Sequence, residues 1–368
     1  MTISNITHTN QFDFSNTMFV PQEYYDGLDS KRKVQEGDVL YSVVGSFGIP
    51  VYIKNNTPFV FQRHIAILRP NVYKIAPQFL YYTMLNRDFY LKADAAAIGA
   101  AQRTVSLTAL RNMEIEIPHI ETQKKVAKIL SSYDNLIENH QKQIKLLEEA
   151  AQRLYKEWFV DLRFPGYENV KIVDGVPEGW EKDTIDSRIE LLSGYAFKSS
   201  EFNDEGKYKI ITIKNVKDGQ FDGDNVKRMI NIPEKMPEHC KLVDGDILLS
   251  LTGNVGRVCI VHGENFLLNQ RVAKLRSNNM AYTYCLFRSK DMFDNMNNLT
   301  NGVAQQNLSP IRTGKINIVF PTDALIQMFE KTVNPMLNKI TVLNKSILSL
   351  SQARDRLLPK LMNGEIEV

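Results

Sequence analysis

The chain carries two copies of one pattern, and this internal repeat restricts its possible folds more than any other feature. Residues 37–48 resemble residues 245–256, an offset of 208, and Gln62-Arg63 meets Gln270-Arg271 at the same offset. Residues 99–106 resemble 302–309, and 115–118 resemble 318–321, at an offset of 203. Matches that keep their order predict a tandem duplication with a five-residue deletion between the blocks.

Both copies show the same order of expected elements. A Gly-Asp turn leads into a buried strand that ends in a Gly-x-x-Gly loop, and a second strand, a helix and a strand ending at a proline follow. These elements are expected at 39–44 and 247–251, at 65–68 and 272–275, near 78–87 and 282–288, and at 115–118 and 318–321.

A long amphipathic helix is expected after each proline. Its apolar residues alternate at spacings of four and three, which is the a/d seam of a coiled coil. In the second helix Pro335 is expected to kink or interrupt the helix. Polar breaks in the seams occur only at His140 and Arg354. The a positions are 130, 137, 144, 151 and 158, the d positions are 126, 133, 140, 147 and 154, and the second helix repeats both sets 203 residues later.

Two arrangements of these helices follow from the pattern. Each helix could pack on its own globular domain, or the two could pair with each other, and a seam sustained over several heptads favours pairing. A helix of ~35 residues spans roughly 50 Å, or about 15 base pairs of DNA. An antiparallel pair would hold two similar domains apart, as a ruler for a two-part DNA site.

Composition excludes several classes of protein. The 45 basic and 42 acidic residues give a net charge of only +3, which neither requires nor excludes DNA. Cys240, Cys259 and Cys285 lie too far apart for a disulfide framework or a zinc cluster. No apolar run is long enough to cross a membrane and the N-terminus does not resemble a signal peptide, so we expect a cytoplasmic protein.

No catalytic motif is recognisable in the sequence. Residues 334–336 (Asn-Pro-Met) lack the second proline and the aromatic residue of an adenine methyltransferase motif. Residues 313–316 lack the first glycine and the hydroxyl of a phosphate-binding loop. His239 and Cys240 adjoin, without a second pair of metal ligands nearby. We therefore expect a chain that is not an enzyme and that holds neither a metal ion nor a cofactor.

Three segments give the chain a family resemblance. They are the end of the first long helix at 154–166 (Leu-Tyr-Lys-Glu-Trp-Phe-Val-Asp-Leu-Arg-Phe-Pro-Gly), residues 176–180 (Val-Pro-Glu-Gly-Trp) and residues 193–199 (Ser-Gly-Tyr-Ala-Phe-Lys-Ser). With the two halves and their helices, they make the chain resemble the specificity subunit of type I DNA restriction-modification enzymes. The resemblance covers essentially the whole chain.

The resemblance implies a fold and a set of partners. The fold is α+β, with two duplicated mixed α/β target recognition domains joined by two long antiparallel coiled-coil helices. The implied partners are double-stranded DNA, two methyltransferase subunits and two restriction subunits. S-adenosylmethionine, ATP and Mg2+ would bind those partner subunits and not this chain.

Domain boundaries follow from the repeat and the resemblance. We expect the first recognition domain at 1–118, the central spacer helix at 119–161 and a linker at 162–175. The second recognition domain is expected at 176–321, the C-terminal spacer helix at 322–362 and a tail at 363–368. Residues 2–6 resemble 212–216, so the first domain is expected to lack its opening segment and to be less stable than the second. Equal hydrogen-exchange protection of both domains would contradict that expectation.

Candidate DNA contacts come from residue type and position. Arg, Gln and Asn suit base edges, while Lys, Arg and small hydroxyls suit phosphates. Residues that both halves share could instead hold the fold together, whereas residues that differ between the halves, such as Arg103 against Gln306, are better candidates for specificity. The candidates are Ser46, Phe47, Gln62, Arg63, Gln102, Arg103, Tyr195, Lys198, Asn254, Arg257, Gln270, Arg271, Gln305 and Gln306.

Other positions have competing interpretations. Ser106 and Ser309 are as well explained as helix N-caps as by DNA contact. Trp158 and Phe159 are candidates for contact with partner subunits, although Trp158 continues the seam and could be ordinary core. Alternative functions are a coiled-coil scaffold, a truncated specificity variant that does not read DNA, and the specificity subunit of a modification-only methyltransferase.

Overall fold

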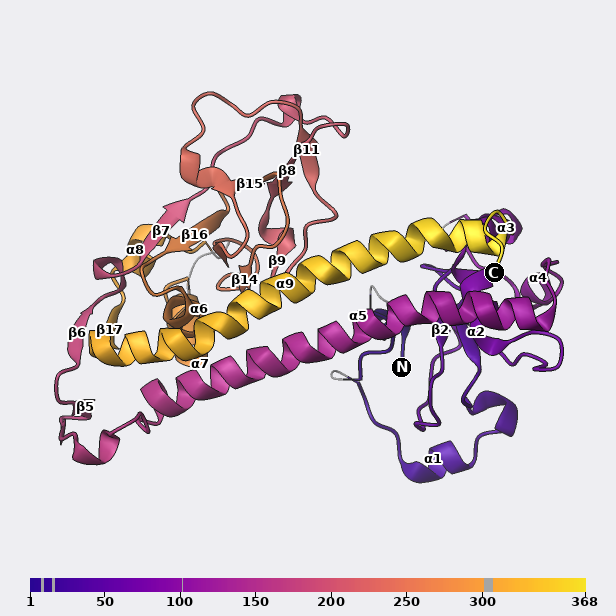
Figure 1. Ribbon diagram of the computed structural model, residues 1–368, viewed down its shortest axis with the longest axis horizontal. Coiled ribbons are helices and arrows are strands. Elements are labelled where there is room, and N and C mark those ends of the chain that lie inside the picture. The colour runs from indigo at the N-terminus through magenta and orange to yellow at the C-terminus, as the bar shows by residue number, and fades with distance from the viewer. Residues whose placement is uncertain (8–9, 15–16, 101, 301–306) are drawn as a thin grey trace. The chain divides into compact units, whose positions relative to one another are not determined.

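The computed structural model describes residues 1–368 except 8–9, 15–16, 101 and 301–306 (Figure 1). The chain folds into two units. Residues 1–137 and 349–368 form unit 1, and residues 138–348 form unit 2. Each unit contains a mixed α/β part and a portion of both long helices, α5 (Ile120–Tyr155) and α9 (Asp323–Met362).

Unit 2 is built on a four-stranded antiparallel sheet of order β14-β13-β16-β7. Unit 2 also contains a second four-stranded sheet, of order β11-β8-β15-β12, and the two-stranded pairs β17-β6, β10-β9 and β4-β5. The strands of the first sheet are β7 (Glu190–Ser193), β13 (Ile247–Ser250), β14 (Val258–Ile260) and β16 (Val272–Arg276). The other elements are β4 (Ile172–Val173), β5 (Val176–Pro177), β6 (Glu181–Thr184), β8 (Tyr208–Ile211), β9 (Val216–Lys217), β10 (Gln220–Phe221), β11 (Lys227–Met229), β12 (Lys241–Leu242), β15 (Phe266–Leu268), β17 (Asn317–Phe320), α6 (Met280–Arg288), α7 (Lys290–Asn298) and α8 (Pro310–Gly314).

Unit 1 repeats the first sheet with three strands, in the order β2-β1-β3. β1 (Val39–Ser42), β2 (Pro50–Tyr52) and β3 (Ile65–Leu68) correspond to β13, β14 and β16. The helices are α1 (Gln22–Asp26), α2 (Pro77–Leu85), α3 (Arg87–Ala96) and α4 (Leu107–Arg111). The duplication and the predicted central strands are therefore confirmed.

Matching hydrogen bonds show how closely the two units correspond. In the turn before β1, Asp38 accepts from the N–H of Gln35 at 2.8 Å, and before β13 Asp246 accepts from the N–H of Val243 at 2.9 Å. Near the N-terminus, Asn5 accepts from the N–H of Thr2 at 2.9 Å. Asn215 and Thr212 form the same bond, also at 2.9 Å. The resemblance of residues 2–6 to 212–216 thus reflects one shared turn.

The expected strand at 115–118 is wrong. Its counterpart forms β17 because β6 pairs with it along Asn317–Phe320. Residues 115–118 are not in a strand, because unit 1 provides no partner strand for them among the described residues. Extended backbone becomes a strand only when its N–H and C=O groups meet those of a neighbour.

The long helices run antiparallel within each unit. In unit 1, Val126 and Leu130 of α5 share a core with Leu358 and Leu361 of α9. In unit 2 the late α5 residue Ala151 packs in the core that holds the early part of α9. All predicted a and d positions are buried or half-buried, which confirms the coiled-coil pairing within the units.

Pro335 does not interrupt α9, which is continuous from Asp323 to Met362. Of the two effects expected of Pro335, a kink or an interruption, the structure contradicts the interruption. Pro335 and Lys331, whose carbonyl loses its partner, are both exposed. Water can satisfy that carbonyl on an exposed face, so the helix continues through the proline.

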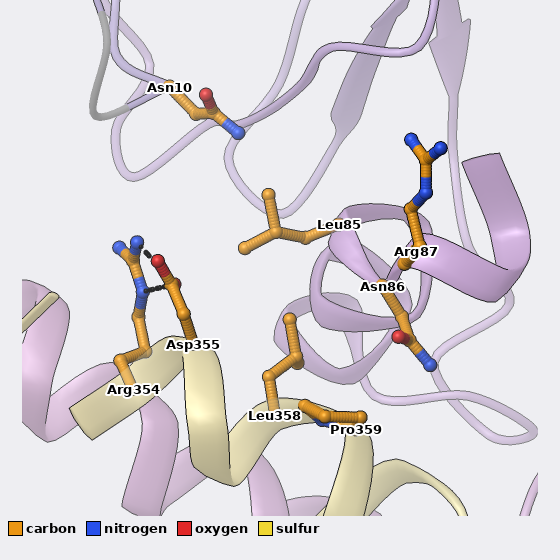
Figure 2. A pocket seen from close by; sticks show the side chains of 8 residues that line it. All are labelled: Asn10, Leu85, Asn86, Arg87, Arg354, Asp355, Leu358 and Pro359. Carbon is orange, nitrogen blue, oxygen red and sulfur yellow. Dashed lines mark hydrogen bonds and ion pairs between the residues drawn. The ribbon is translucent and has the colours of Figure 1, made fainter. Parts of the chain in front are cut away.

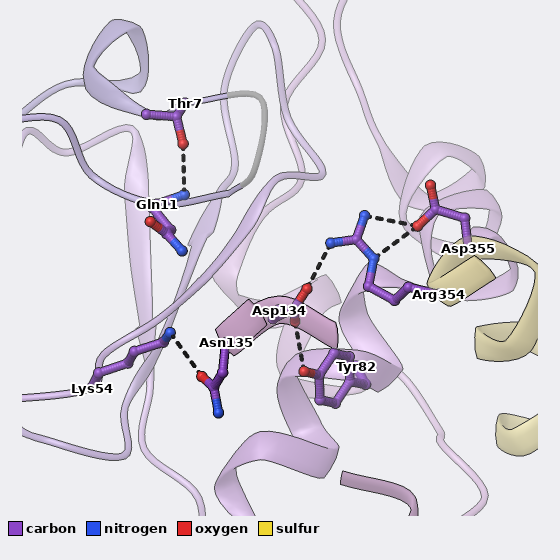
Figure 3. A network of polar contacts seen from close by, with 8 residues as sticks. All are labelled: Thr7, Gln11, Lys54, Tyr82, Asp134, Asn135, Arg354 and Asp355. Carbon is purple, nitrogen blue, oxygen red and sulfur yellow. Dashed lines mark hydrogen bonds and ion pairs between the residues drawn. The ribbon is translucent and has the colours of Figure 1, made fainter. Parts of the chain in front are cut away.

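Arg354, the polar break in the second seam, has a partner on the facing helix. Its guanidinium lies 2.7 Å from the Asp134 carboxylate of α5, and the Tyr82 hydroxyl of α2 donates to the same carboxylate at 2.6 Å (Figure 3). Asp355 also pairs with Arg354, at 2.8 Å. This network joins α2, α5 and α9 within unit 1. His140, the other polar seam residue, keeps its buried Nδ1 without a partner among the described residues.

Candidate nucleic-acid interface

The Gly-x-x-Gly loops of the two units share one hydrogen-bond frame. In unit 1 the Ser42 hydroxyl donates to the Ser46 carbonyl at 2.9 Å and accepts from the Ile49 N–H at 2.9 Å. In unit 2 the Ser250 hydroxyl donates to the Asn254 carbonyl and accepts from the Arg257 N–H at 2.9 Å. Both serines are fully buried, so each loop is held from beneath.

Glycine is needed at both ends of these loops. Gly45 and Gly48 have φ values of 70° and 95°, and Gly253 and Gly256 have 69° and 79°. Residues with a Cβ atom rarely adopt such values. At Gly48 an added Cβ would also lie 2.6 Å from the ring of Tyr90. The frame therefore fixes the loop backbone and leaves the tip residues to vary.

The loop tips expose one side chain each and bury the next. Ser46 and Asn254 are exposed. Phe47 is 8% exposed and Val255 is 3% exposed. The Phe47 ring stacks on Tyr90, with centroids 5.8 Å apart. Of the two predicted tip contacts in unit 1, Ser46 is available at the surface, whereas Phe47 packs into the loop's support.

Arg103 lies beside the unit 1 loop and is already engaged. Its guanidinium pairs with the Asp94 carboxylate, donates to the Asp94 carbonyl at 2.5 Å and lies 5.6 Å from the Phe47 ring centroid. The side chain keeps 44% of its surface exposed. Gln102 next to it is exposed as well. The structure thus brings three predicted contacts, Ser46, Gln102 and Arg103, to one loop region.

The shared Gln-Arg pairs have exposed side chains and structural backbones. Gln62 and Arg63 are exposed in unit 1, as are Gln270 and Arg271 in unit 2. The Arg271 carbonyl accepts from the N–H of Leu251 at 3.0 Å, next to β13. In unit 1 the equivalent bond runs from the N–H of Val43 to the carbonyl of His64 at 2.9 Å, so the structure places His64, and not Arg63, at the position of Arg271. The side chains of both Gln-Arg pairs nevertheless lie at the surface.

Tyr195 reaches the same region of unit 2 through backbone bonds. Its carbonyl accepts from the N–H of Gln270 at 3.0 Å. The Tyr195 ring is half-buried against Phe197, with centroids 5.2 Å apart, and Lys198 beyond it is exposed. The Arg257 side chain is half-buried. The structure therefore places the backbones of Tyr195 and Gln270 side by side, although the Tyr195 ring packs partly in the core.

Two further predictions have separate outcomes. Gln305 and Gln306 lie outside the described residues. Ser106 accepts from the N–H of Ala109 at 3.0 Å, and Ser309 accepts from that of Arg312 at 3.4 Å. The N-cap interpretation of both serines is confirmed.

Trp158 and Phe159 lie in an aromatic cluster of unit 2. The Phe329 ring centroid of α9 lies 5.8 Å from that of Trp158 and 5.0 Å from that of Phe159. Phe159 also packs on Tyr282 at 5.2 Å. Both residues are half-buried, so packing within unit 2 accounts for much of their surface.

A buried charge pair that no sequence pattern indicates joins α5 to α6. Glu148 of α5 pairs with Arg288 and accepts from the Tyr284 hydroxyl at 2.6 Å. Glu148 and Arg288 are only 14% and 15% exposed. Burial raises the pKa of Glu148, and the positive charge of Arg288 opposes this rise. A glutamate beside a helix seam usually faces solvent, so the sequence held no signal for this contact.

A second missed residue is Gln123, which is 1% exposed near the start of α5. Its amide oxygen accepts from the N–H of Ala76 at 2.9 Å, just before α2, and its amide nitrogen donates to the Pro118 carbonyl at 2.8 Å. In unit 2 Glu330 of α9 plays a similar part by accepting from the N–H of Tyr282 at 2.7 Å. These side chains tie the sheet-bearing part of each unit to its long helix.

A hollow of about 350 Å3 in unit 1 offers no recognisable catalytic pair. Arg354 and Asp355 line it and bond to each other, and the remaining side chains are apolar or are amide and arginine groups (Figure 2). The full lining is Asn10, Leu85, Asn86, Arg87, Arg354, Asp355, Leu358 and Pro359.

The described residues hold neither a cluster of metal-binding side chains nor a helix suited to span a membrane. They contain no group of three or more His, Cys, Asp or Glu side chains placed to hold a metal ion. None of the helices they form is both long and apolar enough to pass through a lipid bilayer.

Comparison with known families identifies both halves of the chain. A model of the type I restriction modification DNA specificity domain matches residues 6–149 and again residues 177–327. The chain belongs to this specificity family. Each matched stretch contains one sheet-bearing part, and the first also contains most of α5, whereas the second contains only the first residues of α9. The predicted duplication, and the prediction of a type I specificity subunit, are thereby confirmed.

Relatives within the specificity family match along most of the chain. The MjaIX specificity subunit of Methanocaldococcus jannaschii is 26% identical over 80% of this chain and 70% of its own length. The HindI specificity subunit of Haemophilus influenzae is 23% identical over 98% of this chain and 94% of its own length. Among solved structures, the S subunit of a type I restriction-modification system from M. genitalium aligns with a TM-score of 0.55. The two are 20% identical, and the alignment covers 89% of this chain and 83% of that one. This last likeness confirms the fold.

Proposed function

We propose that this specificity-family chain reads a bipartite, asymmetric DNA site, with one half-site read by each unit. The observation that carries the proposal is a shared loop frame with different tips. Ser42 and Ser250 hold equivalent loops, yet the exposed tips are Ser46 in unit 1 and Asn254 in unit 2. A duplicated scaffold that varies at exposed tips suits two different half-sites.

The tip chemistry suits different bases. The Asn254 amide can donate and accept at once, as in bidentate contact with adenine, whereas the Ser46 hydroxyl makes less specific contacts. The exposed pairs Gln62-Arg63 and Gln270-Arg271 suit phosphates or base edges. Readout would then combine common contacts that position DNA with tip contacts that differ between the units.

The chain would act within a multisubunit complex and would not catalyse a reaction. The partners proposed are two methyltransferase subunits and two restriction subunits, with S-adenosylmethionine, ATP and Mg2+ bound by those partners. Leu146 and Val342, on α5 and α9, are 64% and 58% exposed. These apolar side chains are better candidates for partner contact than Trp158 and Phe159, which already pack against Phe329.

Methylome sequencing of the host tests the DNA-reading proposal. Deletion of the gene should remove methylation at one gapped, asymmetric motif, and restoring the gene should return it. The Asn254→Ala substitution should broaden the range of bases accepted in only one half of that motif. An unchanged methylome after deletion would favour a scaffold role or a variant that does not read DNA. ATP-dependent DNA cleavage by the reconstituted complex would separate a restriction system from a modification-only one.

Gel-shift titration at fixed salt tests Arg103 directly. Arg103→Ala should weaken binding to one half-site by about tenfold, since it removes a cation beside the Ser46 loop. Asp94→Ala is the matched control because it removes the carboxylate partner of Arg103 and keeps the guanidinium. Equal affinity of the Arg103→Ala variant and the natural chain would remove Arg103 from the interface.

A further inference from the structure

The sheet of unit 1 is open on a side that is covered in unit 2. β3 is the edge strand of the order β2-β1-β3, whereas its counterpart β16 lies inside the order β14-β13-β16-β7. β7 covers β16 along Ala273–Arg276. Unit 1 has no counterpart of β7 among its described residues.

The open edge of β3 carries main-chain groups that could bind another strand. The N–H of Val43 donates to the His64 carbonyl at 2.9 Å, so His64, Ala66 and Leu68 face β1. By the same alternation, the N–H and C=O of Ile67 point away from β1. In unit 2 the equivalent outer edge is used, because the Val272 carbonyl accepts from the N–H of Gly194 at 3.1 Å.

A second open edge lies at residues 114–117. In unit 2 the equivalent β17 pairs with β6, and Phe320 is 1% exposed. In unit 1 the equivalent Ile117 is 42% exposed. Leu107 of α4 is 58% exposed as well, and the counterpart helix α8 contacts both β7 and the turn Ile185–Ser187. Both open places in unit 1 therefore match surfaces that one segment covers in unit 2.

That covering segment is short and continuous. It consists of β6, the turn Ile185–Ser187 and β7, and it spans residues 181–193. Ile185 and Ile189 anchor it, since they are 0% and 2% exposed in the core of unit 2. The segment thus contributes two edge pairings and two buried apolar side chains.

We propose that β3 and residues 114–117 form a docking surface for a polypeptide segment of this same kind. Such a segment would have two short strands joined by a turn and apolar residues at the places of Ile185 and Ile189. It would add one strand antiparallel to β3, which is the recognition mode called β-augmentation. This inference does not depend on DNA reading.

One difference between the units defines the partner more closely. Arg111 of unit 1 stands at the place of Gly314, at the repeat offset of 203. A Cβ at Gly314 would lie 3.0 Å from the Cβ of Asp186. The docked segment therefore needs a small residue at the place of Asp186.

Peptide binding to the full chain tests the proposal. The probe is a fluorescent peptide with the sequence of residues 177–195, prepared unchanged and with Asp186→Gly. We expect saturable anisotropy changes, tighter with the glycine peptide, and hydrogen-exchange protection at residues 65–69 and 114–117. Absence of saturable binding by both peptides, or equal binding of a scrambled peptide, would overturn the proposal.

Matched variants of β3 locate the binding edge. Ile67→Pro removes the outward N–H and should weaken binding by about tenfold or more, whereas Ile67→Ala keeps that donor and should weaken it less. Unchanged exchange protection at residues 39–42 shows that the variant sheet is folded. Equal binding by the two variants would refute strand addition at β3. If the chain forms a dimer that dissociates in the Ile67→Pro variant but not on addition of the peptide, the edge binds a second copy of the chain, and the proposal is overturned.

Discussion

Removing the Asp134 carboxylate should destabilise unit 1, because two buried partners depend on it. In the Asp134→Ala variant, Arg354 loses an ion pair of 2.7 Å and the Tyr82 hydroxyl loses its acceptor at 2.6 Å. Arg354 and Asp134 are only 13% and 15% exposed, so water cannot fully replace these contacts (Figure 3). The variant therefore leaves a guanidinium and a hydroxyl poorly satisfied between helices.

The expected loss lies between two limits. An exposed ion pair contributes about 0–1 kcal/mol, and breaking a fully buried one costs about 3–5 kcal/mol. Arg354 keeps Asp355 at 2.8 Å, so its charge is not left alone. We therefore expect a loss of about 2–3 kcal/mol in the free energy of unfolding. For a unit of this size, each kcal/mol lowers Tm by about 2–4 °C.

Urea unfolding followed by circular dichroism measures the loss, and hydrogen exchange assigns it to unit 1. The double variant Asp134→Leu/Arg354→Met replaces both charges with apolar groups at the seam. It should recover much of the stability, because apolar pairs often substitute well for buried ion pairs. The double variant is compared with Asp134→Leu alone and Arg354→Met alone. If the losses of the two single variants simply add up in the double variant, with no coupling of about 1 kcal/mol or more, the reasoning is refuted.

Three other variants test separate parts of unit 2. Burial lowers the pKa of His262, so the stability that its neutral form contributes is present above about pH 6.5 and is lost as the pH falls. His262→Gln should therefore reduce the drop in the urea midpoint between pH 7.5 and pH 5, and an unchanged drop would contradict this. Ser250→Ala should cost about 1–2 kcal/mol and speed hydrogen exchange at residues 253–256, with weaker binding of one half-site in gel shifts. Trp158→Ala should cost about 2–3 kcal/mol in thermal unfolding because Trp158 packs on Phe329; lost methyltransferase binding at unchanged stability would place Trp158 at a partner surface instead.

Local pattern in the sequence was enough to predict the main architecture. Apolar runs placed the central strands, and the heptads placed the long helices and their seams, because both signals repeat with the geometry of the element they describe. The offset of 203 also predicted which residues of α9 correspond to those of α5. Ser46 and Asn254 could be selected from sequence because they differ between otherwise matching loops.

Tertiary structure decided which of these residues are available and which are paired. Phe47 is buried by Tyr90, Arg103 pairs with Asp94, and Glu148 pairs with Arg288. No sequence motif links the members of these pairs. Residues 115–118 have the same local pattern as β17 but form no strand, because the part of the chain that the structure describes places no strand beside them. Periodicity records which face of an element is apolar, whereas pairing and burial depend on what the fold places against that face.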